Sequence, residues 1–301
     1  DVDGGTLALT GLSAARGTFK ATVSGNDTII SLVAPPPQSP GGGSSGGGGT
    51  TTTTPTPVTP TIVVTPSTPI TSTGSGATTA STITNTGTTA GSAAIVQNSG
   101  NNGNVVTATL PPSTTIVSEG PSQAQSGGDA ITSLVTSIQA RGSTGEPGLV
   151  SGAQTFLTRL QATSTLDVRT IIPTTTSTSL SDPIVITGTG DTGQSEAFVI
   201  DVRGLPSGST LQLDNIEFAS IIGSATVNGG SGDNYAVGDD ASQFISLGEG
   251  TDTLYGGDGD DTIGSAGGDD ALYGDAGDDL VMGGTGDDTV SGGTGDDTLS
   301  G

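Results

Sequence analysis

Six aspartates near the C-terminal end of the sequence recur at intervals of nine residues. They are Asp252, Asp261, Asp270, Asp279, Asp288 and Asp297. The sequence contains no Lys or Arg after Arg203 that could neutralise them, and it contains no Cys and no His. Nitrogen and sulfur ligands for a metal are therefore missing, whereas carboxylate and carbonyl oxygens bind hard cations. We interpret these aspartates as candidate ligands of such a cation.

Glycines recur in the same frame as the aspartates. Glycine accepts positive φ angles and close backbone approach, so the chain can turn sharply with its carbonyl oxygens directed at one spot. Flexible turns that offer six or more oxygens favour Ca²⁺ over Mg²⁺, which demands tighter octahedral geometry. The glycines expected to contribute to the metal sites are Gly250, Gly257, Gly259, Gly268, Gly277, Gly284, Gly286, Gly293 and Gly295.

The nine-residue period runs without insertion or deletion over residues 229–300. Numbered from Gly229, each unit has its aspartate at position 6, except that Asn234 and Gln243 occupy this position in the first two units. Position 8 is always apolar: Ala236, Ile245, Leu254, Ile263, Leu272, Val281, Val290 and Leu299. A disordered acidic tail is the alternative interpretation, but disorder does not require an apolar residue at every ninth position. Residues 220–228 fit the frame as a degenerate first unit.

The units resemble GGxGxDxUx, the calcium-binding nonapeptide of repeats-in-toxin (RTX, hemolysin-type) proteins. The resemblance covers roughly the last quarter of the chain. It implies a parallel β-roll in which two units form one coil and bound Ca²⁺ stabilises the fold. Stacked neighbours are then eighteen residues apart, with Asp252, Asp270 and Asp288 on one edge and Asp261, Asp279 and Asp297 on the other.

Such stacking places the aspartates close together. At a coil spacing of about 4.8 Å, two carboxylates repel by roughly 1 kcal/mol in water and about 3–4 kcal/mol at an effective dielectric constant near 20. Bound calcium ions are therefore the expected counter-charge. The aspartates at position 5 alternate in direction with those at position 6 and are expected to face solvent.

Composition restricts the class of protein. The 301 residues include 30 acidic and 6 basic side chains, for a net charge of -24, so nucleic acid and anionic membrane surfaces are unlikely partners. Without Cys and His, a Ser-His-Asp triad, a Cys-His pair and a Cys/His zinc site are excluded within this sequence. No apolar run is long enough to span a membrane as a helix.

The predicted fold is mainly β, and it divides by composition. Residues 1–33 are interpreted as the C-terminal part of a truncated β domain, with strands around residues 7–9, 19–23 and 29–33 and a turn at residues 25–27. Residues 34–128 are interpreted as a low-complexity Gly/Thr/Pro linker, mostly disordered, with one hairpin formed by AAIVQ and VVTATL. Residues 129–219 form a small α+β segment, and residues 220–301 form the calcium-binding β-roll.

Two helices are expected in the α+β segment. Ile131, Leu134, Val135 and Ile138 have helical spacing, with Asp129 as N-cap and Gly142 past the end. Leu149, Ala153, Phe156, Leu157 and Leu160 repeat the spacing, so the helices are expected to form a hairpin. The sequences TLDVRTII, PIVITG, EAFVIDVRG and STLQLDNIEFASII are expected to be strands.

The function that follows is calcium binding by a secreted or surface-displayed bacterial protein that folds on Ca²⁺ after export. The resemblance implies export by a one-step (type I) secretion machine and an extracellular location. A structural or adhesive role, with an unknown cell-surface partner, is the preferred hypothesis. The alternative is an export and folding module of a toxin or hydrolase whose catalytic domain lies outside these residues. No catalytic residues are predicted within the sequence, because its acids form no recognisable pair or triad.

Overall fold

The computed structural model describes residues 18–24, 27–33, 62–70, 78–97, 105–142, 147–160, 164–188 and 194–301. The chain divides into two compact units, Asp1–Pro57 and Val58–Gly301. In the first unit, β1 (Thr18–Ser24) pairs antiparallel with β2 (Asp27–Val33), which confirms two of the three strands expected there. The third expected strand, at residues 7–9, and most of the expected turn lie outside the described residues.

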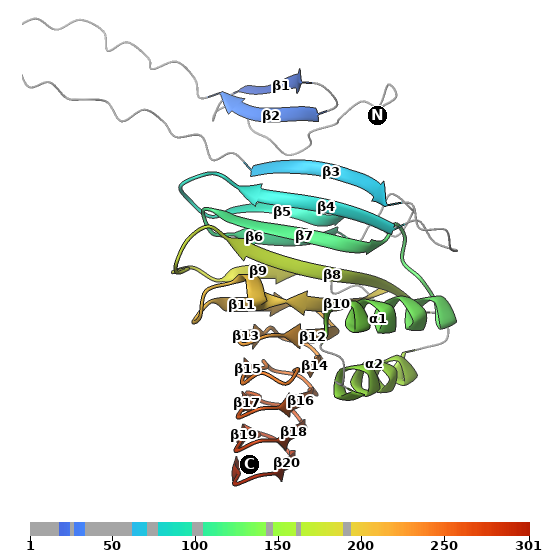
Figure 1. Cartoon of the computed structure of the whole chain (residues 1–301), viewed down its shortest axis with the longest axis vertical. Coiled ribbons are helices and arrows are strands. Elements are labelled where there is room, and N and C mark those ends of the chain that lie inside the picture. Colours follow the sequence, from blue (N-terminus) through green and yellow to red (C-terminus); the bar gives the residue numbers. More distant parts are fainter. Residues whose placement is uncertain are drawn as a thin grey trace, which may run out of the picture. The chain divides into compact units, whose positions relative to one another are not determined.

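The second unit is built from two long sheets, and from β8 onward successive strands alternate between them (Figure 1). In the ten-stranded sheet the order is β20-β18-β16-β14-β12-β10-β8-β7-β4-β3, and in the nine-stranded sheet it is β21-β19-β17-β15-β13-β11-β9-β6-β5. Pairing is antiparallel from β3 to β8 and from β5 to β9, and parallel beyond. The parallel part is therefore a two-sided solenoid.

The first strands of this unit lie in residues that the linker interpretation covered. Buried and half-buried side chains alternate over the first part of Thr114–Pro121 and the last part of Thr78–Asn85, and the β-branched residues of both strands suit a pleated surface. The expected hairpin is confirmed by the pairing of β5 with β6. The strands are β3 (Ile62–Ile70), β4 (Thr78–Asn85), β5 (Gly91–Gln97), β6 (Val105–Leu110) and β7 (Thr114–Pro121). Residues 34–61 and 71–77 lie outside the description, and the domain boundaries stay predictions.

Two helices, α1 (Gly127–Arg141) and α2 (Pro147–Arg159), cover the outer face of the ten-stranded sheet (Figure 1). Leu134, Ile138, Leu149 and Phe156 are buried there against Phe218 and other sheet residues. Two details differ from expectation. Ile131 is 41% exposed and Ala130 is buried in its place, and the N-cap of α1 is Ser126, with Asp129 in the first turn.

The strands after the helices occur where the sequence predicts them, with two interruptions. Asn215, which has a positive φ of 54°, ends one strand and allows the chain to turn into the next, so STLQLDNIEFASII forms two strands. A 3-10 helix, Val202–Gly204, ends the strand that includes EAFVID. These strands are β8 (Thr165–Thr175), β9 (Ile184–Thr187), β10 (Gln194–Asp201), β11 (Thr210–Asp214), β12 (Phe218–Ile222) and β13 (Thr226–Gly229).

The repeats continue the solenoid as very short strands. Residues eighteen apart pair, as Leu254 does with Leu272, so two units form one coil as expected. The strands are β14 (Tyr235–Val237), β15 (Phe244–Ser246), β16 (Thr253–Asp258), β17 (Thr262–Gly264), β18 (Ala271–Ala276), β19 (Leu280–Met282), β20 (Thr289–Thr294) and β21 (Thr298–Ser300). Position 8 faces the interior, from Ala236 at 4% exposed to Val281 at 0%, whereas Leu299 on the last coil is 49% exposed.

Candidate metal sites in the turns of the roll

The turns between the short strands depend on glycine at position 4. Gly250, Gly268 and Gly286 have φ angles of 144°, 128° and 142°, which L side chains rarely adopt. A Cβ atom on Gly268 would overlap the carbonyl oxygen of Gly250 in the preceding coil. The same holds on the other edge, where Gly277 and Gly295 lie against the carbonyls of Gly259 and Gly277. Position 4 therefore brings carbonyl oxygens of successive coils into one line.

The position-6 aspartates form two continuous ladders, one on each edge. The backbone N–H of Asp252 donates to Oδ1 of Asp270 at 2.8 Å, and that of Asp270 donates to Oδ1 of Asp288 at 3.1 Å. On the other edge, the N–H of Asp261 donates to Asp279 at 2.8 Å, and that of Asp279 to Asp297 at 3.0 Å. Each carboxylate thus reaches back to the preceding coil, and the stacking that the sequence predicted is confirmed.

The second oxygen of these carboxylates is the unusual feature of the turns. Oδ2 of Asp261, Asp270, Asp279 and Asp288 is buried and, within the described part of the chain, has no hydrogen-bond partner. The first three of these side chains are only 2% exposed. A buried carboxylate oxygen without a hydrogen bond is costly, so each such oxygen calls for a cationic neighbour.

Glycine at position 1 makes room for this oxygen. A Cβ atom on Gly256 would meet Oδ2 of Asp261, and one on Gly274, Gly283 or Gly292 would meet Oδ2 of the aspartate five residues later. The sequence analysis assigned the metal sites to glycines at positions 2 and 4 and missed this role. The recurrence of glycine at position 1 was the available signal.

Burial changes the acidity of the ladder carboxylates. Desolvation raises the pKa of Asp252 to about 6, although hydrogen bonds from Asn234 and Ser265 oppose the shift. Desolvation also raises the pKa of Asp261 to about 7, against a hydrogen bond from the backbone of Gln243 and with repulsion from Asp279. Desolvation also raises the pKa of Asp279. Without a bound cation, these three carboxyl groups therefore keep their protons to higher pH than an ordinary aspartate does.

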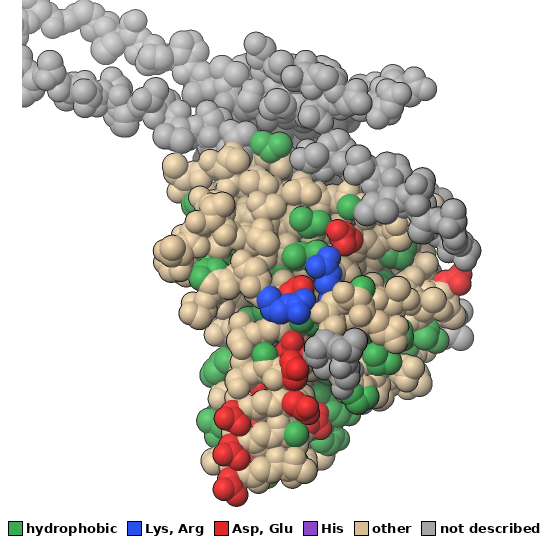
Figure 2. Space-filling model, in the orientation of Figure 1, with side chains coloured by type: hydrophobic (Ala, Val, Ile, Leu, Met, Phe, Trp, Pro, Cys, Tyr) green, Lys and Arg blue, Asp and Glu red, His purple; other side chains and the backbone are tan. Residues whose placement is uncertain are grey.

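The position-5 aspartates behave differently. Asp260, Asp269, Asp278, Asp287 and Asp296 are all exposed, as predicted. Their carboxylates point along the stack in the opposite sense: Asp269 accepts from the N–H of Asp287, in the following coil, at 3.0 Å. Figure 2 shows acidic side chains along the repeat part of the roll and basic side chains beyond it. Among the described residues, the salt bridges join Arg141 and Arg203 to Glu119 and Asp201, and none includes the array.

The ladders begin with amides in place of carboxylates. Asn234 donates through Nδ2 to the carbonyl of Ile216 at 3.1 Å, and Gln243 donates through Nε2 to Oδ1 of Asp239. Their own backbone N–H groups donate to Asp252 and Asp261, the first carboxylates of the two ladders, at 2.8 and 2.7 Å. These two turns thus have a neutral N–H donor at position 6, although Oδ1 of Asn234 and Oε1 of Gln243 are themselves buried without a hydrogen-bond partner in the described structure.

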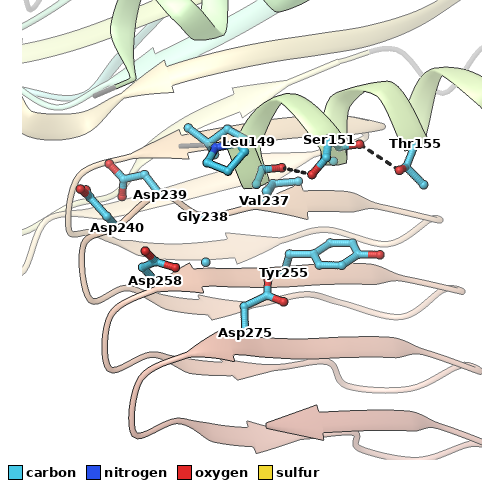
Figure 3. A pocket seen from close by; sticks show the side chains of 14 residues that line it. Leu149, Ser151, Thr155, Val237, Gly238, Asp239, Asp240, Tyr255, Asp258 and Asp275 are labelled. Atoms are coloured by element: carbon cyan, nitrogen blue, oxygen red, sulfur yellow. Dashed lines mark hydrogen bonds between the residues drawn. The ribbon is translucent and has the colours of Figure 1, made fainter. Parts of the chain in front are cut away.

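A separate hollow of about 490 Å³ lies between the start of α2 and one edge of the roll (Figure 3). Its acidic residues come from positions 2 and 3 of the repeats: Asp239, Asp240, Asp258 and Asp275. Asp275 has a positive φ of 75°, and desolvation followed by repulsion from Asp279 raises its pKa. Within the described ranges, no three acidic side chains converge to hold a metal ion. Metal sites in the ladders must therefore draw on backbone oxygens as well.

These features define a class of protein: a parallel β-solenoid whose turns present stacked carboxylates and carbonyl oxygens. Residues 237–272 and 273–301 match the family model of the RTX calcium-binding nonapeptide repeat. This C-terminal segment therefore consists of RTX repeats, and RTX nonapeptide repeats bind Ca²⁺. No match to a curated protein or to a solved structure was found.

The described residues fit calcium as the missing partner. The atoms available as metal ligands are all oxygens, and the second carboxylate oxygens are buried without partners. The glycine turns allow the backbones of successive coils, with their carbonyl oxygens, to approach closely. The predicted ligands, which stay a prediction, divide between the two edges of the roll. Asp252, Asp270 and Asp288 lie with Gly250, Gly268, Gly284 and Gly286, whereas Asp261, Asp279 and Asp297 lie with Gly257, Gly259, Gly277, Gly293 and Gly295.

Proposed function

We propose that the position-6 aspartates and the turn carbonyls, including those of the predicted glycines, hold Ca²⁺ between successive coils. The observation that carries this proposal is the pair of columns of buried Oδ2 atoms without partners, Asp270 and Asp288 on one edge and Asp261 and Asp279 on the other. A cation between two coils neutralises carboxylates that otherwise repel at close range. The two carboxylates of a coil pair leave several ligand positions for carbonyl oxygens, which the larger Ca²⁺ accepts more readily than Mg²⁺.

The function of these sites is to make folding depend on calcium. The interior of a repeat coil contains one apolar side chain per strand, which is little to offset the entropy of ordering eighteen residues. A ligand that binds only the folded state stabilises it by about 1.4 kcal/mol at ten times its Kd, and four such sites contribute about 5–6 kcal/mol. Extracellular calcium modules have dissociation constants of about 10⁻⁴ to 10⁻³ M, so millimolar Ca²⁺ suffices.

This dependence suits a protein that is exported unfolded and folds outside the cell. We therefore place the protein extracellularly, secreted or displayed on the surface, with type I secretion as the route and a structural or adhesive role. The RTX roll is a structural calcium-binding element and has no catalytic role of its own. The alternative is that the roll serves export and folding of a toxin or hydrolase with its catalytic domain elsewhere. In the described part of the chain, no helix is long and apolar enough to cross a membrane.

A circular dichroism titration of the 301-residue chain tests the proposal. Adding millimolar Ca²⁺ to chelator-treated protein should increase the β signal and raise Tm, whereas the same concentration of Mg²⁺ should do neither. An unchanged spectrum and Tm on adding Ca²⁺ would exclude calcium-driven folding. Equal responses to both ions would instead indicate general screening of the acidic charge rather than specific sites.

A further inference from the structure

Ser265 occupies position 1 of its repeat, where six other array units have glycine: Gly229, Gly238, Gly256, Gly274, Gly283 and Gly292. Its hydroxyl oxygen lies 3.0 Å from Oδ2 of Asp252 and 3.2 Å from the carbonyl oxygen of Gly248. Asp252 and Gly248 both belong to the preceding coil of the same edge. The side chain of Ser265 therefore bridges two coils, which a glycine at this position cannot do.

A single hydroxyl proton cannot satisfy both acceptors fully. A serine hydroxyl has one O–H donor and two lone pairs, and both neighbours of Ser265 are oxygens that only accept. The three oxygens therefore form a cluster that is short of protons. Calcium ligands lie 2.3–2.6 Å from the ion, so adjacent ligand oxygens are roughly 3.0–3.4 Å apart. The two distances at Ser265 match the spacing of oxygens that share one face of such a coordination shell.

Asp270 provides an independent sign of a missing cation in the same pair of coils. Its Oδ1 accepts the backbone N–H of Asp252 at 2.8 Å, so the carboxylate is directed at the coil that contains Asp252 and Gly248. Its Oδ2 has no partner in the described structure, and the side chain is 2% exposed. An unpartnered carboxylate oxygen buried to this extent indicates that the coil pair has a place for a positive charge.

We propose that the hydroxyl oxygen of Ser265 is a calcium ligand of the site between Asp252 and Asp270, in addition to the carboxylates and carbonyls. This inference rests on the proposed calcium binding and adds a side-chain ligand outside the aspartate and glycine positions. Position 1 has no side chain in the six glycine units, so the site at Ser265 differs in composition from its neighbours. Substitution of Ser265 should therefore remove a ligand from this site and lower its affinity for Ca²⁺.

Calorimetric titration of the full chain with Ca²⁺ tests the role of Ser265. Ser265→Ala and Ser265→Gly should each weaken one site by roughly 3- to 10-fold and leave the other sites unchanged, a loss comparable to that of one ordinary hydrogen bond. Ser265→Thr, which keeps the hydroxyl, should restore the affinity. Ser291→Ala provides a control, because Ser291 is an exposed serine on β20 of the array that does not occupy position 1.

The direction in which calcium affinity changes when the Ser265 hydroxyl is removed shows whether this hydroxyl is a calcium ligand or a group that competes with calcium. If the hydroxyl only donated a hydrogen bond in the calcium-free protein, its removal would eliminate a competing interaction, and affinity would stay the same or rise. Either result would overturn the proposal for Ser265. Wild-type protein that binds no Ca²⁺ would instead refute the proposed function. Wild-type binding with an unchanged Ser265→Ala variant would refute only the role of Ser265.

Discussion

The coils formed by β12–β15 and those formed by β16–β21 follow the same two-sided backbone path, but different interactions hold their turns together. In the first group, amides of Asn234 and Gln243 donate to oxygens of the chain, and α2 packs on the sheet through Phe156, Phe218 and Tyr235. In the second group, charged carboxylates occupy the same positions, and Oδ2 of Asp261, Asp270, Asp279 and Asp288 is buried without a donor in the described structure. The first coils thus bury a neutral amide where the later coils bury a carboxylate, so the later coils are the ones that call for a cation at this position.

The helical cover ends near the point where the turns change. Arg159 at the end of α2 donates to Oγ1 of Thr253 on β16 at 2.9 Å and lies over the ring of Tyr235, 4.9 Å from its centroid. Gly152 lies directly against Val237, with no room for a Cβ atom. The coils near α2 therefore gain packing that the later coils lack. We expect the first coils to serve as a calcium-independent support on which the later coils fold.

The largest expected effect concerns calcium removal. With chelator present, the amide protons of β16–β21 should exchange rapidly, because the later coils lose the cations that offset carboxylate repulsion. The amides of α1 and of β8–β12 should stay protected, because packing and chain donors hold them. Hydrogen exchange measured with and without Ca²⁺ on the full chain checks this. Uniform loss of protection across both groups of coils would refute the comparison.

The next largest effect is expected for a glycine at position 4. Gly268→Ala places a Cβ atom against the carbonyl of Gly250 at a φ of 128°, so the turn must distort and both neighbouring sites should weaken. We expect a loss of several kcal/mol in the free energy of unfolding with Ca²⁺ present, about 2–4 kcal/mol from strain and lost ligands. Denaturant unfolding in Ca²⁺ measures it.

Gly148→Ala on α2 is the matched control for this substitution. Nothing lies within 4 Å of a Cβ atom on Gly148, and the residue is in a helix. Alanine should therefore leave stability unchanged or raise it by about 0.4–1 kcal/mol. Equal losses for the two variants would show that position 4 has no special role in the turns.

A smaller effect should separate the two adjacent aspartates. Asp270→Ala removes a buried carboxylate that serves the sites toward both Asp252 and Asp288, so two sites should weaken together. Asp269→Ala removes an exposed carboxylate that accepts one hydrogen bond, from Asp287, and should cost under about 1 kcal/mol. The two variants are compared by titrating each with Ca²⁺ and using the folding signal as the readout. Equal shifts would mean that position 6 is not the side-chain ligand.

The sequence predicted the roll well because its information is periodic. The nine-residue frame alone placed Leu254 inside, Asp270 beneath Asp252, and Asp269 in solvent. Side-chain contacts between elements have no such period. The bridge from Ser265 to Asp252 and the contact of Arg159 with Tyr235 depend on coil offsets and helix placement, which no local pattern specifies.

The linker interpretation relied on composition, which has no periodic pattern. Thr-rich segments such as Thr78–Asn85 have the composition of a spacer, but β-branched residues also suit strands, and only pairing with β7 decides between these states. The helix pair shows a milder form of the problem. Helical periodicity identified α1, but Ile131 and Ala130 exchange places because the direction of packing is set by the sheet.

The smallest of the four effects is expected from pH in calcium-free protein. Burial raises the pKa of Asp252 to about 6 and of Asp261 to about 7, whereas the unfolded chain has aspartate pKa values of about 3.9. Between these values the folded coils bind more protons than the unfolded chain does, so stability falls as pH rises. In chelator, lowering the pH from about 8 to about 5 should therefore increase the β signal of the later coils, since protonation removes repulsion.

The gain from protonation should stay below that from Ca²⁺, because a proton neutralises one carboxylate and does not connect two coils. With Ca²⁺ present the sign reverses, since protons compete for the same oxygens, and apparent calcium affinity should fall as pH drops through 7 to 6. Circular dichroism at several pH values, with chelator and with Ca²⁺, measures both trends. Calcium-free protein whose β signal rises toward pH 8 would show that the buried carboxylates do not limit the stability of the later coils.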